Sequence, residues 1–234
     1  MCTADKTPQV RNGETGDWIG TFHGHKGAVW SAKIDALTRT LAATASGDFS
    51  ARLWCANTGR ELVEFKHKHV VKSVDFSVDS MRIGTGCQDG LLRIYDVCQT
   101  SAAPTEIKVV TNTANDGVNK IAWSTIDKDI VFIGKKSSSV EKWDLRQDPS
   151  AGPAAAAKLP DVVLPVMDFE LNPKHNIVLA AAGTKVVALA MDTLDVVKTV
   201  DMPSPMTFQN EGGVSLSPDG SKFMAVSRVM EHDE

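Results

Sequence analysis

The chain has 234 residues, of which 42% are hydrophobic and 23% are charged, a composition that supports a folded core and argues against wholesale disorder. The 29 acidic and 25 basic residues leave a net charge of −4, which argues against a basic nucleic-acid-binding domain, so no direct nucleic-acid partner is expected. The four cysteines form no C-x-x-C pair and no signal-like run follows Met1, which predicts a reducing compartment. No apolar run approaches the ~18 residues of a membrane span, so no membrane partner is expected.

In chain order, the first predicted element is a strand over residues 18–22, and a repeat then begins. Residues 22–34 align with residues 65–76, which places His25 over His67. Residues 45–54 align with residues 86–95, which places Asp48 over Asp89 and Trp54 over Tyr95. A weaker third copy runs from Val118 to Asp144. A fourth unit and a partial fifth keep the strand pattern alone.

Within each repeat, apolar residues alternate over runs of four to seven residues, and clusters of Gly, Asp and Ser separate the runs. Alternation with a period of two, bounded by turn residues, predicts β-strands. A repeat of ~40 to 45 residues with Gly-His early and Trp-Asp late is typical of WD40 blades, each a four-stranded antiparallel sheet. The sequence therefore predicts an all-β WD40 β-propeller, with Trp-Asp-type dipeptides at Trp54-Cys55, Tyr95-Asp96 and Trp143-Asp144.

The segments 14–22, 24–30, 67–76 and 92–96 resemble the serine/threonine kinase receptor-associated protein family, and the His67–Lys72 run favours it over its sister, the WD-repeat subunit of translation initiation factor three. The resemblance implies seven blades, so this chain holds about five and forms an incomplete ring. It is expected to be a piece of a longer propeller, and a natural short form is the alternative. The predicted units are a truncated first blade (1–23), blades at 24–62 and 63–104, degenerate blades at 105–159 and 160–201, and a partial blade (202–234).

The resemblance also implies a hydrogen-bonded set in each regular blade, made of a loop histidine, a strand hydroxyl, a turn aspartate and the aromatic residue of the dipeptide. The first set is His25, Thr44 or Ser46, Asp48 and Trp54, and the second is His67, Thr85, Asp89 and Tyr95. The same residue types occur in a Ser/His/Asp triad. A catalytic site has no reason to recur every 41 residues, so we interpret both sets as structural. The third blade has Thr113-Ala114 and Ser137 where histidine and aspartate would stand.

Two further motifs have chemical alternatives. The closely spaced His67 and His69 could bind a metal ion, but no Cys or carboxylate follows at ligand spacing. Lys135-Lys136 before three serines could hold a phosphate, but a solvated hairpin tip is the simpler interpretation. A P-loop is absent. We therefore predict no catalytic residue, no cofactor, no metal and no small-molecule substrate.

A propeller hosts many functions, so the fold alone names none. The predicted function is that of a non-enzymatic scaffold. The resemblance implies a cytoplasmic and partly nuclear adaptor whose partners are ribonucleoprotein assembly factors of the survival-of-motor-neuron complex, in mRNA splicing, and components of the receptor kinase (TGF-beta) pathway. The alternative is a scaffold subunit of translation initiation factor three.

Overall fold

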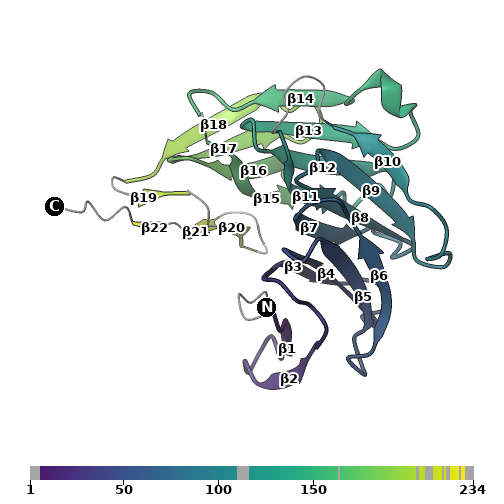
Figure 1. Ribbon diagram of the computed structural model, residues 1–234. Coiled ribbons are helices and arrows are strands. Elements are labelled where there is room, and N and C mark those ends of the chain that lie inside the picture. The colour runs from purple at the N-terminus through teal and green to yellow at the C-terminus, as the bar shows by residue number, and fades with distance from the viewer. Residues whose placement is uncertain are drawn as a thin grey trace. The chain divides into compact units, whose positions relative to one another are not determined.

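The computed structural model describes residues 6–109, 116–162, 164–203, 206–208, 213–217, 219, 222–226 and 228–229. Over these residues the regular structure is β-strand, apart from the 3₁₀ helix η1 (Pro149–Ala151). The chain forms two compact units, Met1–Trp123 and Ser124–Glu234, which are described one at a time (Figure 1).

The first unit opens with a two-stranded antiparallel sheet, β1 (Gln9–Arg11) and β2 (Trp18–Thr21). Two four-stranded antiparallel sheets follow, each with its strands side by side in chain order (Figure 1). The first comprises β3 (Val29–Ile34), β4 (Leu41–Ser46), β5 (Ser50–Cys55) and β6 (Glu61–Lys66). The second comprises β7 (Val71–Phe76), β8 (Arg82–Cys87), β9 (Leu91–Asp96) and β10 (Thr105–Lys108), and β11 (Val118–Trp123) ends the unit.

The strands differ from the expected unit boundaries in one respect. The boundary expected between residues 62 and 63 falls inside β6, because β6 pairs with β5 from Glu61 to Lys66 as the fourth strand of its sheet. The boundary expected between residues 104 and 105 falls directly before β10. It therefore separates β10 from β9, with which β10 pairs as the fourth strand of the next sheet. Thr113-Ala114, expected to replace the Gly-His of the third blade, lies outside the described residues.

Three hairpins, each with a three-residue turn (residues 47–49, 88–90 and 136–138), share one turn geometry. The third residue of each three-residue turn has a positive φ: Phe49 at 66°, Gly90 at 78° and Ser138 at 63°. A three-residue loop of this kind needs a left-handed residue at its end, which glycine supplies without steric cost. The recurrence of the same backbone at three different residue types indicates that the repeat is set by strand pairing.

The core of the first unit lies between its stacked sheets. Val74 and Phe76 of β7 pack in one apolar cluster with residues of β4, β5 and β6. Polar contacts accompany this packing, because inner-strand side chains accept hydrogen bonds from backbone N–H groups of the next inner strand. Ser31 Oγ lies 3.4 Å from the Val74 nitrogen, Ser73 Oγ 3.1 Å from the Ile121 nitrogen, and Asp75 Oδ2 2.8 Å from the Trp123 nitrogen.

The second unit repeats this architecture. Its strands are β12 (Ile130–Lys135), β13 (Ser139–Asp144), β14 (Ala155–Lys158), β15 (Val166–Asn172), β16 (Ile177–Ala182), β17 (Lys185–Ala190), β18 (Val196–Asp201), β19 (Met206–Thr207), β20 (Gly213–Leu216), β21 (Phe223–Val226) and β22 (Arg228–Val229). β12, β13 and β14 pair in that order, and β15 to β18 form a four-stranded sheet. Two-stranded sheets join β19 to β22 and β20 to β21.

Apolar packing dominates the β15–β18 sheet, as the sequence predicted. The five residues expected to hold it are all buried: Val178, Leu179, Val186, Val187 and Leu189. The next inner strand, β20, packs on β15 and uses the same polar contact as the first unit. Asp168 Oδ2 lies 3.2 Å from the Val214 nitrogen and Glu170 Oε2 2.6 Å from the Leu216 nitrogen.

The hairpin of β12 and β13 corrects one expectation. Lys135 is not at a solvated tip: it is buried as the last residue of β12, and its Nζ lies 2.9 Å from Glu141 Oε1. Trp143 Nε1 donates to Glu141 Oε2 at 2.9 Å, so the carboxylate binds both groups. The alternation of strand residues places Lys135 and Glu141 on one face of this hairpin, and that face is covered.

We predict that this buried pair is strongly coupled. Lys135→Met removes the counter-charge of a buried carboxylate and should cost about 3–5 kcal/mol of unfolding free energy. Adding Glu141→Gln removes that uncompensated charge, so the double variant should be more stable than the two single losses predict, by about 1 kcal/mol or more. Urea unfolding of the parent and three variants measures the coupling, and additive losses would contradict the prediction.

Candidate interaction surface

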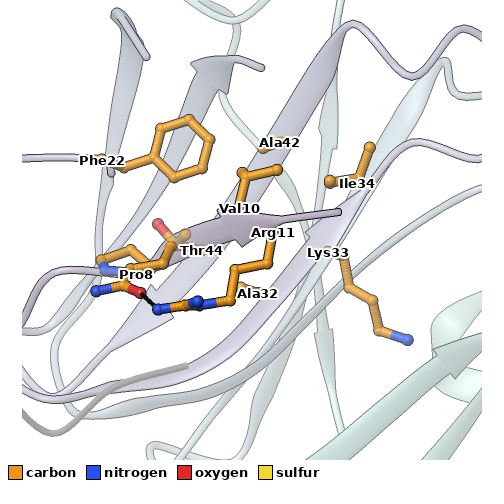
Figure 2. Close-up of a pocket in the computed structure, with 10 residues that line it drawn as sticks. Pro8, Val10, Arg11, Phe22, Ala32, Lys33, Ile34, Ala42 and Thr44 are labelled. Carbon is orange, nitrogen blue, oxygen red and sulfur yellow. Dashed lines mark hydrogen bonds between the residues drawn. The ribbon is translucent and has the colours of Figure 1, made fainter. Parts of the chain in front are cut away.

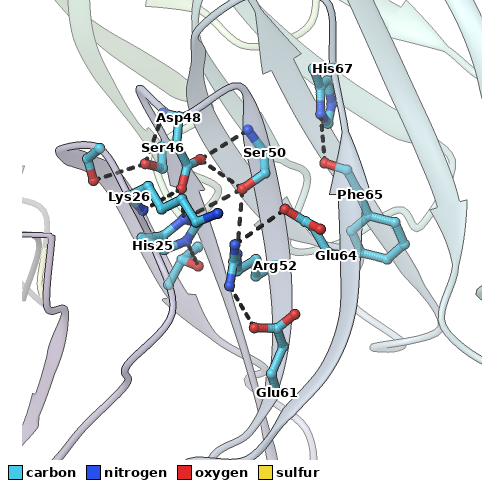
Figure 3. Close-up of polar contacts among 12 residues, drawn as sticks. His25, Lys26, Ser46, Asp48, Ser50, Arg52, Glu61, Glu64, Phe65 and His67 are labelled. Atoms are coloured by element: carbon cyan, nitrogen blue, oxygen red, sulfur yellow. Dashed lines mark hydrogen bonds and ion pairs between the residues drawn. The ribbon is translucent and has the colours of Figure 1, made fainter.

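The first predicted set forms a continuous hydrogen-bonded chain (Figure 3). Asp48 Oδ2 lies 2.8 Å from His25 Nδ1, and His25 Nε2 lies 2.6 Å from Thr44 Oγ1. Trp54 Nε1 donates to Thr44 Oγ1 at 2.9 Å. A carboxylate only accepts, so Nδ1 of a neutral His25 carries the proton and Nε2 accepts from the threonine hydroxyl. Each hydrogen bond therefore has a defined donor: Trp54 donates to Thr44, Thr44 donates to His25, and His25 donates to Asp48.

The strand hydroxyl of this chain is Thr44, and Ser46 has a different partner. Ser46 Oγ donates to the Gly27 carbonyl at 3.0 Å and accepts from the Asp48 backbone N–H. Sequence reasoning missed Ser50, whose hydroxyl donates to Asp48 Oδ1 at 2.7 Å. Its position two residues after the aspartate, inside an Asp-x-Ser turn, is the signal that could have identified it.

Arg52 extends the polar network along the sheet. Its Nη1 lies 2.6 Å from Glu61 Oε2 and its Nη2 3.2 Å from Glu64 Oε1, so one buried guanidinium binds two carboxylates of β6 (Figure 3). The repeat aligned Arg52 with Arg93, and that alignment was the available sign of a shared role. The pairing satisfies a buried charge and ties β5 to β6.

The second set corrects one expectation, because Asp89 does not bind His67. Nδ1 of His67 donates to the Phe65 carbonyl at 3.0 Å, and its Nε2 lies 2.9 Å from Thr85 Oγ1. The chain has one residue fewer between Phe65 and His67 than between Phe22 and His25. The imidazole of His67 therefore hydrogen-bonds to β6, the strand that directly precedes it. Asp89 accepts from Arg93 Nη2 at 2.8 Å, and Arg93 Nε donates to Glu106.

Tyr95 occupies the position of Trp54 with weaker polar contact. Its hydroxyl lies 3.5 Å from His67 Nε2, at the limit of a hydrogen bond. Its ring packs on Phe65, with centroids 4.1 Å apart. Burial raises the pKa of Tyr95 to about 12, so the phenol stays protonated as a donor. Packing therefore holds this aromatic residue more than hydrogen bonding does.

The remaining dipeptide residues lie at strand ends. Asp96 accepts from the backbone nitrogens of Cys98 and Gln99, which closes the turn after β9. Asp144 forms an ion pair with Arg146 at 2.8 Å. Cys55, in place of the usual aspartate, is partly buried. These residues organise turns.

Electrostatics keep both histidines neutral. Burial lowers the pKa of His25, and the Asp48 carboxylate only partly offsets that effect. Burial, together with the Arg93 charge, lowers the pKa of His67 to about 4. Burial alone would raise the pKa of Asp48, but hydrogen bonds from Ser50, the Lys26 nitrogen and His25 outweigh it and hold the pKa at about 2. The Thr44 hydroxyl, which lies between His25 and Trp54, is buried, so this hydrogen-bonded set offers no exposed nucleophile.

The described residues provide little else for chemistry. Among them no three His, Cys, Asp or Glu side chains gather as a metal site. His69, considered with His67 as a ligand pair, accepts a hydrogen bond from the Val70 nitrogen at 2.8 Å. Within the same part of the chain, no helix is long and apolar enough to cross a membrane.

Three exposed aromatic side chains and a half-buried lysine lie together in the first unit. Lys72 Nζ lies 3.2 Å from the ring centroid of Trp30, a cation–π contact, and burial lowers the pKa of Lys72. Phe49 lies against His69 with centroids 5.7 Å apart. A Cβ atom at Gly47, in the turn of Phe49, would lie 3.3 Å from the Trp30 indole nitrogen, so the two pairs adjoin. We call Trp30, Phe49, His69 and Lys72 the aromatic surface. Sequence reasoning missed it, although Trp30 and Lys72 occupy one repeat position.

We predict that Asp48 stabilises the fold. Asp48→Ala removes the acceptor of His25, Lys26 and Ser50 and should cost on the order of 1–3 kcal/mol. Glu14→Ala, at an exposed turn, is the matched control and should leave the melting temperature unchanged. Thermal melting of both variants provides the measurement. A parent-like melt for Asp48→Ala would contradict a structural role.

We also predict a loss of stability in mild acid. The unfolded chain titrates its histidines near 6.5, while the folded pKa of His67 is about 4 and that of His25 is lowered. The unfolded state therefore binds more protons in this range, so stability is complete above pH ~6.5 and falls as the pH drops toward 4. His67 alone contributes about 3 kcal/mol at most.

Urea unfolding between pH 4.5 and 7.5 tests this prediction. His67→Gln should flatten the pH dependence, and His23→Gln, at an exposed residue, should leave it unchanged. Equal slopes for the parent and His67→Gln would contradict it.

Comparison with known proteins supports the repeat. The family model "WD domain, G-beta repeat" matches residues 16–55 and 59–96. The second match begins just before β6 and ends with β9, so one sequence repeat joins the outer strand of one sheet to three strands of the next. The predicted fold class, all-β with WD40 propeller blades, is confirmed.

Curated relatives identify the family. The chain is 40% identical over 94% of its length to serine-threonine kinase receptor-associated protein of Gallus gallus, and 33% identical over 94% to that of Dictyostelium discoideum. It spans 58% and 70% of these relatives, respectively. Eukaryotic translation initiation factor 3 subunit I of Schizosaccharomyces pombe is 26% identical over 88% of the chain and 63% of that relative. The chain belongs to the serine-threonine kinase receptor-associated protein family of WD40-repeat proteins.

Proposed function

We propose that this protein is a non-enzymatic adaptor that brings partner proteins together. The identity of 33–40% over 94% of the chain to receptor-associated proteins is the observation that carries the proposal. The names of these relatives state an association with serine-threonine kinase receptors, which supports partners in a receptor kinase pathway. The buried hydroxyl and imidazole of the His25 set, and their hydrogen bonds to each other and to the partly buried Asp48 carboxylate, support a structural role for the residues that could otherwise suggest catalysis.

The family resemblance also suggests which partners the adaptor binds and where in the cell it acts. We propose cytoplasmic and partly nuclear partners that assemble spliceosomal ribonucleoproteins with the survival-of-motor-neuron complex, and components of TGF-beta signalling. The net charge of −4 supports contact with proteins over direct contact with RNA. The second candidate is a translation-initiation scaffold. It is supported by the 26% identity to initiation factor 3 subunit I, which is lower than the identity to the receptor-associated proteins.

The aromatic surface is the proposed contact site. Aromatic side chains are enriched at protein interfaces, because Trp and Tyr combine a large apolar area with a polar group. Trp30 and Phe49 are exposed large apolar residues at adjoining positions. The Lys72 ammonium over Trp30 adds a charge that an acidic partner segment would match.

Affinity purification with mass spectrometry from cells of the source organism tests both levels of the proposal. The parent should capture ribonucleoprotein assembly factors or receptor kinase components, and Trp30→Ala combined with Phe49→Gly should reduce that capture at least tenfold. Leu37→Ala, at an exposed residue in the turn between β3 and β4, is the control and should retain that capture. Capture of initiation-factor subunits alone would favour the alternative, and parent-like capture by the double variant would overturn the assigned surface.

A further inference from the structure

The aromatic surface lies at the junction of the two four-stranded sheets of the first unit. Trp30 belongs to β3 and Lys72 to β7. Phe49 ends the turn between β4 and β5, and His69 lies in the loop between β6 and β7. The backbone N–H of His67 donates to the Phe49 carbonyl at 2.8 Å, so this loop is fixed to that turn. Strands and loops of these two sheets therefore form the whole surface.

Trp30 and Lys72 are each the extra residue of a β-bulge. The pairing of β3 with β4, and of β7 with β8, shifts register at the second residue of the inner strand, so these residues have no partner opposite them. A bulge re-aims the side chain of its extra residue. The preceding residues, Val29 and Val71, are both buried, whereas the two bulge side chains meet outside that layer in a cation–π contact.

The Lys72 ammonium is half-buried against the indole. Its Nζ lies 3.2 Å from the centroid of the Trp30 ring. Burial lowers the pKa of Lys72, and among the described residues no carboxylate forms an ion pair with its Nζ. A partly desolvated cation without an anion gains from a carboxylate that a partner brings, because charged hydrogen bonds are the strong ones.

Two further lysines flank the aromatic surface. The backbone N–H of Lys26 donates to Asp48 Oδ2 at 2.8 Å, which places Lys26 beside the turn of Phe49 (Figure 3). Lys68 directly precedes His69, whose ring lies against Phe49. Both lysines are exposed. We call Lys26 and Lys68 the flanking lysines.

Positive charge is concentrated at this end of the two sheets. Four lysines and two aspartates lie there, in residues 23–28, 47–49, 66–72 and 88–90. Both aspartates have partners within the fold: Asp48 binds His25, and Asp89 binds Arg93. Two arginines and two aspartates lie at the opposite end, in residues 35–40, 56–60, 77–81 and 97–104. A chain with a net charge of −4 thus presents a local positive excess around the aromatic surface.

A cavity of about 290 Å³ in the first unit also places cations beside apolar side chains (Figure 2). Its cations already have polar partners. Arg11 donates to Gln9 Oε1 at 3.1 Å and to the Gly16 carbonyl at 3.0 Å. Lys33 Nζ lies 3.9 Å from Asp75 Oδ1. The aromatic surface is therefore better suited than this cavity to an anionic partner.

We propose that the aromatic surface binds a short acidic peptide segment of a partner protein, a proposal that rests on the adaptor function proposed above. A carboxylate of the segment pairs with Lys72 Nζ at the edge of the Trp30 ring. An apolar side chain of the segment packs between Trp30 and Phe49, and further carboxylates meet the flanking lysines. Apolar burial supplies affinity, and the charges set specificity and the rate of association.

The surface suits carboxylates better than a nucleic-acid strand. A single-stranded nucleic-acid site follows the backbone with a basic groove and stacks successive bases on open aromatic faces. Here the Lys72 ammonium covers one face of Trp30, and His69 lies against Phe49. The net charge of −4 opposes a long polyanion beyond the local lysines.

Fluorescence anisotropy of a labelled peptide tests the charge requirement. The probe is the synthetic peptide Glu-Asp-Glu-Phe-Glu-Asp-Glu, and the control peptide carries Gln and Asn in place of Glu and Asp. The 234-residue chain should bind the acidic peptide saturably and the amide peptide about tenfold more weakly or worse. Raising NaCl from about 0.05 M to about 0.5 M should weaken the acidic complex, because salt screens exposed charges. No saturable binding, or equal binding of both peptides, would overturn the proposal.

Charge variants assign the site on the protein. Lys72→Met keeps an aliphatic chain beside Trp30 but removes the charge, and Lys26→Gln with Lys68→Gln removes the flanking charges. Each variant should weaken binding of the acidic peptide about tenfold or more. The flanking lysines are exposed and form no ion pair among the described residues, so their double variant tests the site without disturbing the fold. Parent-like binding by both variants would overturn the assignment.

Two controls separate this site from general charge attraction. Arg39→Gln with Arg60→Gln removes the same charge from exposed turns at the opposite end of the first sheet. Lys33→Gln removes a cation of the cavity. Both controls should bind the acidic peptide like the parent, and all variants are compared after thermal melting. A loss in either control equal to that of the flanking-lysine variant would overturn the proposal.

Two further measurements distinguish the partner classes. An oligouridylate of about ten nucleotides that displaces the peptide at an equal or lower concentration would overturn a peptide site in favour of nucleic acid. In affinity purification, partners that the parent captures and Lys72→Met loses would support both the site and the adaptor function. Equal capture by both chains without peptide binding would overturn the peptide site and leave the adaptor function standing. Peptide binding by a parent that captures no partner would support the site and contradict the adaptor function.

Discussion

The stacking of inner strands is the constraint on which the described structure depends. The inner strands β7 and β11 each contribute two apolar side chains that pack on the preceding sheet, and a side-chain oxygen of that sheet accepts a hydrogen bond from their backbone N–H groups. Serine fills this role in β3 and β7, and aspartate and glutamate fill it in β15. Burial of a backbone N–H without a partner is costly, so the apolar and polar contacts must be made together. The spacing of the sheets follows from that requirement.

The repeat predicted the strands and the first hydrogen-bonded set because both depend on residue spacing. His25, Thr44, Asp48 and Trp54 meet as expected, since the β4–β5 hairpin fixes three of them and the loop of Gly24 delivers the fourth. The second set differed because one residue is missing before His67. That single deletion moves the imidazole onto its own strand and gives Asp89 to Arg93. The alignment of the repeats still matches His67 to His25 across this deletion, but the deletion changes which groups the imidazole can reach.

Burial at strand ends was the part that the sequence could not predict. Lys135 lies in a polar segment of the kind that usually forms a solvated turn. It is buried because Glu141, the third residue of the following strand, pairs with its ammonium group. The aromatic surface was missed for the opposite reason. Trp30 occupies a strand position that alternation places away from the core, but an aromatic residue in a strand is ordinarily assigned to the core. Both outcomes depend on which face a neighbouring layer covers, and one strand's pattern carries no record of that layer.

The strands β5, β9 and β13 show what the repeat preserves in its first three hairpins. Arg52 and Arg93 hold the third position of their strands with carboxylate partners on the neighbouring strand, and Glu141 holds it with Lys135. The sign of the charge is reversed, but the position remains buried and paired in all three hairpins. A buried charge that lost its partner would cost several kcal/mol, whereas a reversed pair keeps the same balance. In these three hairpins the repeat therefore keeps a buried charge pair while its residue types change, and the third hairpin retains such a pair although it lacks the turn aspartate.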